Sequence, residues 1–223
     1  MDDMKNLTLA HPTLIVMVGV PGAGKSFFAR QFAEAHDLAC ISADRLRFEL
    51  FNDPRFTPNE QEVVMRITNY MTDEFLASGA SFILDSTFAN ARTQRMNIER
   101  RARAKGYKTL FIWTQVDDTT AKLRSFKRNN KKRDDQYNAN MPEPAFTALA
   151  KQLTAPSSEQ FVVISGKHTF PAQHKAVLRK LEPSKEESKQ EFPHEPHKVI
   201  TPTPTRRMNQ PSARPENRRI TIN

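Results

Sequence analysis

Hydrophobic positions along the first 181 residues alternate between short apolar runs and amphipathic stretches with a helical period. The apolar runs predict buried strands over residues 13–18, 38–41, 81–85, 107–116 and 160–165. The stretches between them predict helices over 26–36, from about 44, over 58–78, 91–105, from 119, over 143–153 and over 171–181. Strands separated by helices of this length are typical of an α/β fold with a parallel sheet covered on both faces.

Two local signals mark the ends of the longest predicted helix. Thr57 and Glu60 have the spacing of a capping box, and Pro58 stands at the first helical position between them. Gly79 interrupts the pattern, because glycine readily adopts the left-handed conformation that ends many helices. We therefore expect one long helix from Pro58 to about Ser78.

The composition changes beyond Glu182. Seven of the fifteen prolines lie between Pro183 and Pro215, and the apolar periodicity is lost. Such a segment buries too little apolar surface to offset the entropy of ordering it, so we expect residues 182–223 to be disordered. Its last part, 198–219, is mostly basic, which fits either a solvated tail or a tether to nucleic acid or another anion. The predicted organisation is one domain over 1–181 and a Pro-rich basic tail.

Composition narrows the class of protein. The chain has 223 residues, 38% of them hydrophobic, and a formal net charge of +9. This charge fits a polyanionic partner such as ATP or nucleic acid, and it equally fits plain solubility. The single cysteine, Cys40, excludes an internal disulfide framework, and its place in a predicted buried strand indicates a small hydrophobic residue. No apolar run approaches the roughly 20 residues that span a membrane, and the first residues lack the order of a signal peptide. We therefore expect a cytoplasmic protein without a membrane partner.

A glycine-rich motif follows the first predicted strand. Residues 19–26 satisfy the pattern G-x-x-x-x-G-K-[ST] of a phosphate-binding P-loop. Glycines let successive N–H groups converge on phosphate oxygens, and the N-terminus of the next helix adds partial positive charge. Lys25 is expected to reach the β- and γ-phosphates of ATP, and Ser26 to ligate Mg²⁺. The expected nucleotide-binding residues are Gly19, Val20, Pro21, Gly22, Ala23, Gly24, Lys25 and Ser26.

Two carboxylates follow the ends of neighbouring predicted strands. Asp44 comes after the strand 38–41, and Asp85 ends the strand 81–85. Ligands of parallel sheets bind beyond the carboxyl ends of the strands, so both should lie beside the P-loop. One carboxylate, assigned to Asp85, would hold the metal or its water shell, and the other would accept the proton of an attacking hydroxyl. Two plainer interpretations stay open here, Asp44 as a helix cap and Asp85 as a turn former.

A basic segment lies between residues 122 and 133. It carries seven positive charges and no acid, where a solvated helix face usually mixes both signs. A basic lid over about 124–140 that closes on the triphosphate explains this bias, because a transferring phosphoryl group needs added positive charge. A generic basic surface is the alternative.

These motifs together carry a family resemblance over residues 12–181. The loop GVPGAGKS, the segment SADRLR, the strand end ILDST and the arginine-bearing lid resemble P-loop kinases of AAA type, including polynucleotide 5′-kinase and zeta toxins. The resemblance implies a three-layer α/β/α fold with a five-stranded sheet in the order 2-3-1-4-5. It also implies that Asp44 is the general base and that Arg47 steadies the acceptor or the moving phosphate. Asp85 and Thr87 would line the same cleft, and Arg128 would be a lid arginine.

The chain departs from the polynucleotide kinase pattern at two points. Phe88 stands where those kinases commonly have an asparagine after the threonine of the third strand motif. Their lid arginines are four residues apart, whereas Arg128 is followed by Lys132 at four and Arg133 at five, so either is a candidate for the second lid cation and we select Arg133. Both departures bear on the acceptor rather than on ATP.

The sequence favours an ATP-dependent kinase that acts on a nucleic-acid 5′ end, a nucleoside or a small metabolite. One alternative is a nucleotide-binding regulatory or interaction module whose basic tail contacts nucleic acid. Another is a toxin-like kinase of nucleotide sugars. Both kinds of kinase need Asp44 as a base, whereas the module does not.

Overall fold

Five parallel strands form one sheet in the order β2-β3-β1-β4-β5, as the resemblance predicts. The computed structural model describes residues 9–127 and 140–181. The strands are β1 (Thr13–Val18), β2 (Ala39–Ser42), β3 (Phe82–Asp85), β4 (Lys108–Gln115) and β5 (Phe161–Ser165). The predictions for Arg128, Lys132, Arg133 and the tail from residue 182 lie outside the described ranges.

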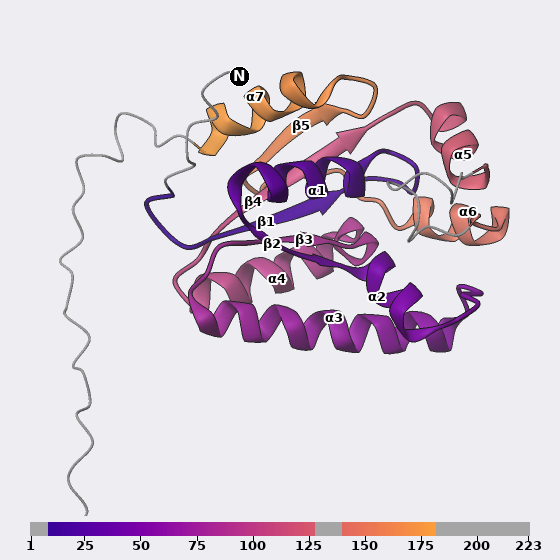
Figure 1. Ribbon diagram of the computed structural model, residues 1–223, viewed down its shortest axis with the longest axis horizontal. Helices are drawn as coiled ribbons and strands as arrows, with labels where there is room; N and C mark the ends of the chain where they lie inside the picture. Colours follow the sequence, from indigo (N-terminus) through magenta and orange to yellow (C-terminus); the bar gives the residue numbers. More distant parts are fainter. Residues whose placement is uncertain (1–8, 128–139, 182–223) are drawn as a thin grey trace, which may run out of the picture.

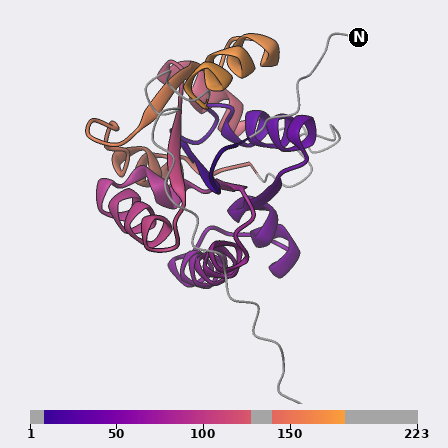
Figure 2. The ribbon, with the colours of Figure 1, turned by 90° about the vertical axis from the view of Figure 1, so that its left-hand side faces the viewer.

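Helices cover both faces of the sheet, which gives three layers. They are α1 (Lys25–His36), α2 (Ala43–Leu50), α3 (Pro58–Ser78), α4 (Arg92–Ala104), α5 (Asp118–Phe126), α6 (Glu143–Lys151) and α7 (Phe170–Leu181), with a short 3₁₀ helix, η1 (Thr87–Asn90). In Figure 1, α1 and α7 lie on one side of the sheet, and α3 and α4 lie on the other. Figure 2, which looks roughly along the strands, shows the same three layers. The strands point toward the end of the molecule where α2, α5 and α6 gather (Figure 1).

The burial of the central strand, β1, explains why helices pack on both faces of the sheet. All six residues of β1 are buried, and side chains alternate between the faces of a strand. Leu14 and Val16 pack in a cluster with residues of α3 and α4, whereas Ile15 and Met17 pack with residues of α1 and α7. A continuous apolar run therefore contributes to two cores at once, as expected for a buried parallel strand.

The start of α3 is confirmed, with one change in its hydrogen bonding. Thr57 is the N-cap, and its side chain accepts from the backbone N–H of Glu60 at 3.3 Å. In a capping box, the Glu60 carboxylate would accept from the backbone N–H of Thr57, but here it has other donors. It accepts from the backbone N–H groups of Arg55 and Phe56, so it ties down the loop before the helix.

The prediction that Cys40 is buried is wrong. β2 is an edge strand of the sheet, and Cys40 lies on its exposed side. An apolar run of four residues cannot distinguish an edge strand from a central one. No helix in the described ranges is long and apolar enough to cross a membrane.

Two histidines join the helix that follows the P-loop to the last described helix. The Nε2 atoms of His36 on α1 and His174 on α7 lie 2.7 Å apart, and the two ring planes differ by 10°. Phe32 and Phe170 pack around the pair. Burial lowers the pKa of both imidazoles, and the charge of the neighbouring ring lowers the pKa of His36 further.

This pair should make stability depend on pH. Because the folded pKa values lie below the unfolded value of 6.5, folding favours the neutral rings. The contribution is therefore complete above about pH 6.5 and is lost as the pH falls toward the folded pKa values. We expect the loss of Tm between pH 7.5 and pH 5.5 to be smaller in His174→Gln than in the wild type. His11→Gln, which changes an exposed histidine, is the control and should keep the wild-type slope. Equal slopes in all three proteins would contradict this interpretation.

Candidate functional site

The P-loop joins β1 to α1 in a conformation that requires glycine. Gly19, Gly22 and Gly24 all have positive φ values, 146°, 77° and 100°. A Cβ atom on Gly19 would lie 2.5 Å from the carbonyl oxygen of Thr114, and one on Gly22 would lie 2.2 Å from that of Ala121. Gly24 is the N-cap of α1, and no side chain in the described part of the chain caps the first turn of this helix. The N-terminal N–H groups of this helix are therefore available to an anion.

The side chain of Lys25 lies folded against the backbone of the P-loop. It is only 6% exposed, and its ammonium donates to the carbonyl oxygens of Gly19 at 2.8 Å and Val20 at 3.0 Å. The charge is thus already centred in the curl of the loop.

Asp85 lies buried beside the P-loop. Its neighbour across the sheet is Ser42, which is its register partner in β2. Burial raises the pKa of Asp85, while the charge of Lys25 and hydrogen bonds with Ser26 and Ser42 oppose that rise, and Asp44 adds to it. The structure thus brings Asp85, Ser26 and Lys25 together, as the sequence predicts.

The donor set around Asp85 suits Mg²⁺. A carboxylate and a hydroxyl are hard oxygen ligands of the type that this ion prefers. A cation there would also offset the cost of burying the carboxylate charge. Ser26 and Asp85 would hold the ion directly or through water, and its chemical contribution would be to neutralise phosphate charge.

Asp44 lies in the first turn of α2 and is not the cap of that helix. Ser42 is the N-cap, and its hydroxyl accepts from the backbone N–H of Arg45 at 3.4 Å. The capping interpretation of Asp44 is therefore wrong. Its half-buried carboxylate lines a cavity of about 480 Å³ that Lys25 and Thr87 also line.

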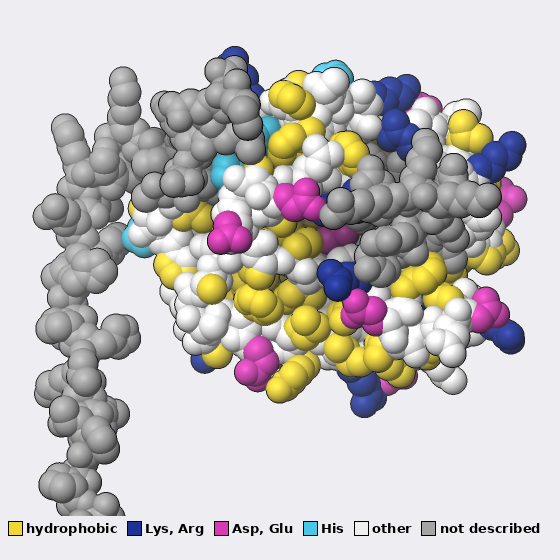
Figure 3. Space-filling model, viewed as in Figure 1, with side chains coloured by type: hydrophobic (Ala, Val, Ile, Leu, Met, Phe, Trp, Pro, Cys, Tyr) yellow, Lys and Arg dark blue, Asp and Glu magenta, His cyan; other side chains and the backbone are white. Residues whose placement is uncertain are grey.

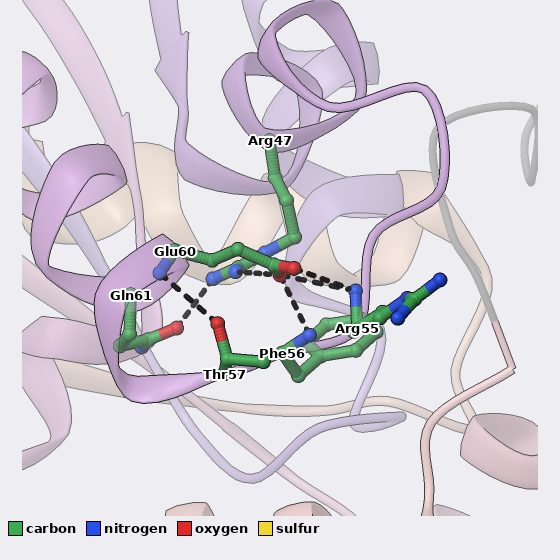
Figure 4. Close-up of polar contacts among 6 residues, drawn as sticks. All are labelled: Arg47, Arg55, Phe56, Thr57, Glu60 and Gln61. Atoms are coloured by element: carbon green, nitrogen blue, oxygen red, sulfur yellow. Dashed lines mark hydrogen bonds and ion pairs between the residues drawn. The ribbon is translucent and has the colours of Figure 1, made fainter.

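Arg47 lies one turn further along α2 and lines the same cavity. Its side chain is 4% exposed and reaches the first turn of α3 (Figure 4). One guanidinium nitrogen donates to Gln61, another lies 3.5 Å from the carboxylate of Glu60, and the Phe56 ring packs 4.8 Å from the guanidinium carbon. Its Nε atom has no hydrogen-bond partner among the described residues.

Asn90 holds the first residue of the P-loop. Its side-chain oxygen accepts from the N–H of Gly19 at 2.9 Å, and its amide donates to the carbonyl of Gly19 at 3.0 Å. Both groups are buried, and Asn90 is fully inaccessible to solvent. Asn90 is not among the predicted site residues, although it lies two positions after Phe88 in the turn that follows β3.

A buried ion pair fixes Asn90 in turn. Arg95 on α4 donates to the carbonyl oxygens of Ala89 and Asn90 at 3.1 and 2.7 Å, and it pairs with Glu159 at 2.9 Å. Burial raises the pKa of Glu159, but the backbone N–H of Ser157 and the Arg95 guanidinium outweigh it and lower the pKa to about 2. Arg95 shares the buried face of its helix with Ile98. A charge on an apolar stripe was the signal that could have revealed it.

The far end of the cavity is basic and lies over α5 and the loop between β5 and α7. Arg124, Lys127 and Lys167 line it, and Lys and Arg side chains, with some Asp and Glu among them, are visible over these elements at the upper right of Figure 3. Arg124 donates to the carbonyl oxygen of Gly166 at 2.9 Å. A Cβ atom on Gly166 would lie 1.9 Å from the carbonyl oxygen of Ala23, so this loop packs directly on the P-loop. Gly166 is not among the predicted site residues.

A family model described as "AAA domain" matches residues 14–156, which is more than half of the chain and includes the P-loop, Asp44, Arg47 and Asp85. The chain belongs to the AAA domain family. No curated protein matches it significantly. Like the cavity, the match includes predicted site residues that follow three different strands, among them Lys25 after β1, Asp44 after β2 and Thr87 after β3.

Solved structures share the fold of this AAA domain. A sugar kinase from Janibacter sp. has a TM-score of 0.56 at 20% identity, covering 76% of this chain and 94% of its own. A gluconokinase from Sinorhizobium meliloti has a TM-score of 0.55 at 19% identity, covering 77% and 92%. Kti12 from Chaetomium thermophilum, in complex with ADP-AlF3, has a TM-score of 0.55 at 16% identity, covering 75% and 96%. The AAA domain thus has the fold of P-loop kinases.

The role of Asn90 in shaping the P-loop can be tested by truncation. Asn90→Ala leaves the N–H and C=O of Gly19 buried without these partners, which should lower the free energy of unfolding by about 1–3 kcal/mol. It should also weaken ADP binding, because the first turn of the loop loses its anchor. Asn97→Ala, which changes an exposed asparagine on α4, is the matched control and should change neither quantity. Wild-type stability and ADP affinity in Asn90→Ala would show that the loop keeps its shape by other means.

Proposed function

We propose that this protein is an ATP-dependent phosphotransferase that moves the γ-phosphate to a hydroxyl group of an acceptor. The observation that carries the proposal is that Asp44 lines the same cavity as the P-loop residues Lys25 and Ser26. A phosphate site and a carboxylate that share one cavity of about 480 Å³ can contact the two ends of a transfer reaction. The fold of P-loop kinases and the family membership support the same class of reaction.

The phosphates of ATP are assigned to the P-loop. The N-terminus of α1, which no described side chain caps, and the curled backbone supply N–H donors, and Lys25 supplies a positive charge. On ATP binding we expect the ammonium of Lys25 to exchange its bonds with the carbonyls of Gly19 and Val20 for phosphate oxygens. Because the charge is already buried in the loop, little reorganisation is needed to present it.

Asp44 is assigned as the general base. As the acceptor oxygen bonds to the γ-phosphorus, the bond from phosphorus to the bridging oxygen of ADP breaks, and the hydroxyl proton passes to the carboxylate. Asp44 suits this role better than Asp85, because Asp85 is buried and already bonded to two serines. Asp85 is assigned with Ser26 to the metal.

Arg47 is assigned to the acceptor or to the transferring phosphate. Glu60 and Gln61 fix its guanidinium, and the face of Phe56 supports it (Figure 4). An arginine held in this way loses little side-chain entropy when it binds a ligand. Its buried Nε atom, which has no partner among residues 9–127 and 140–181, leaves one donor for such a ligand.

The acceptor is a hydroxyl compound of a class that the site leaves open. A nucleic-acid 5′ end, a nucleoside and a small metabolite each carry a suitable hydroxyl. Two solved structures with this fold are named a sugar kinase and a gluconokinase, so sugars and sugar acids belong in the set to be tested. A cytoplasmic location and contacts with nucleic acid through the basic lid and tail remain parts of the proposal.

The nucleotide site is tested by Lys25→Ala. Removing the ammonium should abolish measurable ATP turnover, because it takes away the positive charge buried within the curl of the P-loop. Circular dichroism should show a folded protein. Lys175→Ala, which changes an exposed lysine on α7, is the control and should keep wild-type turnover. A folded Lys25→Ala variant with unchanged turnover would remove the basis for placing ATP in the P-loop.

The role of Asp44 is tested by Asp44→Asn, which keeps the size of the side chain but removes its basicity. Transfer to the acceptor should fall by roughly 10²- to 10⁴-fold, while ATP affinity stays within about twofold. Because Ser42 caps α2, the helix should be unaffected. Asp53→Asn, at an exposed position in the loop before α3, is the matched control. Full transfer activity in Asp44→Asn would mean that another residue is the base.

A further inference from the structure

One end of the site cavity has features that neither phosphate binding nor proton transfer uses. Arg124 of α5, Gly166 and His168 of the loop between β5 and α7, and Gln173 of α7 line it there. A Cβ atom on Gly24 of the P-loop would lie 3.8 Å from the backbone of Gly166, so the two loops are neighbours. A nucleoside whose phosphates occupy the P-loop can therefore extend along this wall.

Gln173 is a buried side chain with a fixed orientation. It is 4% exposed, and its Nε2 group donates to the carbonyl oxygen of Ser165 at 2.8 Å. A carbonyl oxygen can only accept, so this bond decides which end of the amide is nitrogen. The Oε1 atom must therefore face the other way.

The Oε1 atom of Gln173 has no hydrogen-bond partner among the described residues. Most buried polar side-chain atoms have a partner, because an unpaired buried acceptor has lost its bonds with water. Because Gln173 lines the cavity, its Oε1 acceptor is suited to a ligand that brings an N–H or O–H donor. The chemistry of the missing donor can be narrowed further by the neighbouring side chains.

Arg124 indicates a flat ligand at this end of the cavity. Its guanidinium is anchored to the carbonyl oxygen of Gly166 at 2.9 Å. Planar guanidinium groups pack well on aromatic rings. A planar ring with an amino group on its edge would meet both Arg124 and the Oε1 atom of Gln173.

We propose that Gln173 is the residue that selects the nucleotide base, through a hydrogen bond from the exocyclic amino group of adenine to its Oε1 atom. Adenine carries a donor at this position, whereas guanine carries a carbonyl oxygen. The oxygen of guanine would face the oxygen of Gln173, and neither can donate. The proposal rests on the nucleotide site of the proposed function, but not on transfer to any acceptor.

The proposal is tested by comparing ligands that differ in a single group. Purine riboside 5′-diphosphate has the ring of ADP without its amino group, so the ratio of the two Kd values isolates this contact. Isothermal titration calorimetry with Mg²⁺ present should show ADP binding about 3- to 10-fold more tightly to the wild-type protein, the range expected for one hydrogen bond. GDP should bind at least about 10-fold more weakly than ADP.

In the Gln173→Leu variant, the ratio of the Kd values of purine riboside diphosphate and ADP should fall close to one. The fall should come chiefly from weaker binding of ADP. Gln152→Leu, which changes an exposed glutamine at the end of α6, is the control and should keep the wild-type ratio. Should Gln173→Leu fail to fold, Gln173→Met takes its place. The ligand series on the wild-type protein tests the contact without any variant. Equal affinities of the wild type for the two diphosphates would overturn the assignment of Gln173 and leave the phosphate site intact. Absence of binding by every nucleotide would overturn the phosphate site as well.

Discussion

The paired hydrogen bonds between Asn90 and Gly19 are the constraint on which the geometry of the site depends. They fix the point where β1 ends and the P-loop begins, and they satisfy two buried backbone groups that the curl of the loop leaves without partners in the sheet. A loop with three positive φ values has few conformational restraints of its own. Its shape is therefore determined by the surroundings, and Asn90 is the contact that joins it to the turn after β3.

Behind Asn90 lies an ion pair that is costly to bury and costly to break. The side chains of Arg95 and Glu159 are 0% and 2% exposed, and such a pair loses most of its solvation on folding. Replacing both residues by apolar ones of similar size could preserve stability, but it would release the carbonyls of Ala89 and Asn90 from Arg95. We infer that the pair specifies the position of the turn, and through it the P-loop. Glu159 also ties this position to the segment that leads into β5, whose far end carries the loop that lines the other end of the cavity.

The sequence predicts the fold well because its signals are local and periodic. The alternation of apolar runs and amphipathic stretches predicts every strand and α-helix of the described residues within a few positions, and the family resemblance supplies the strand order. Asp44, Asp85 and the P-loop could be brought together from the sequence because all three lie at the carboxyl ends of strands of one parallel sheet. The contacts of Asn90, Arg95, Gly166 and Gln173 could not, because each joins segments far apart in the chain. The exposure of Cys40 was missed because its burial was inferred from the local apolar run, although the strand order implied by the resemblance already places this strand at the edge of the sheet.

We propose that the cavity serves a transfer between two substrates rather than storage of a nucleotide. The most direct measurement follows the γ-phosphate of labelled ATP in the presence of hydroxyl compounds, with oligonucleotides, nucleosides, sugars and sugar acids in separate reactions. We predict slow release of labelled inorganic phosphate from the protein alone, and with one class of compound a faster reaction in which the label appears on the acceptor. Label that appears only as inorganic phosphate, at a rate that no hydroxyl compound changes, would contradict the account and favour a nucleotide-binding module.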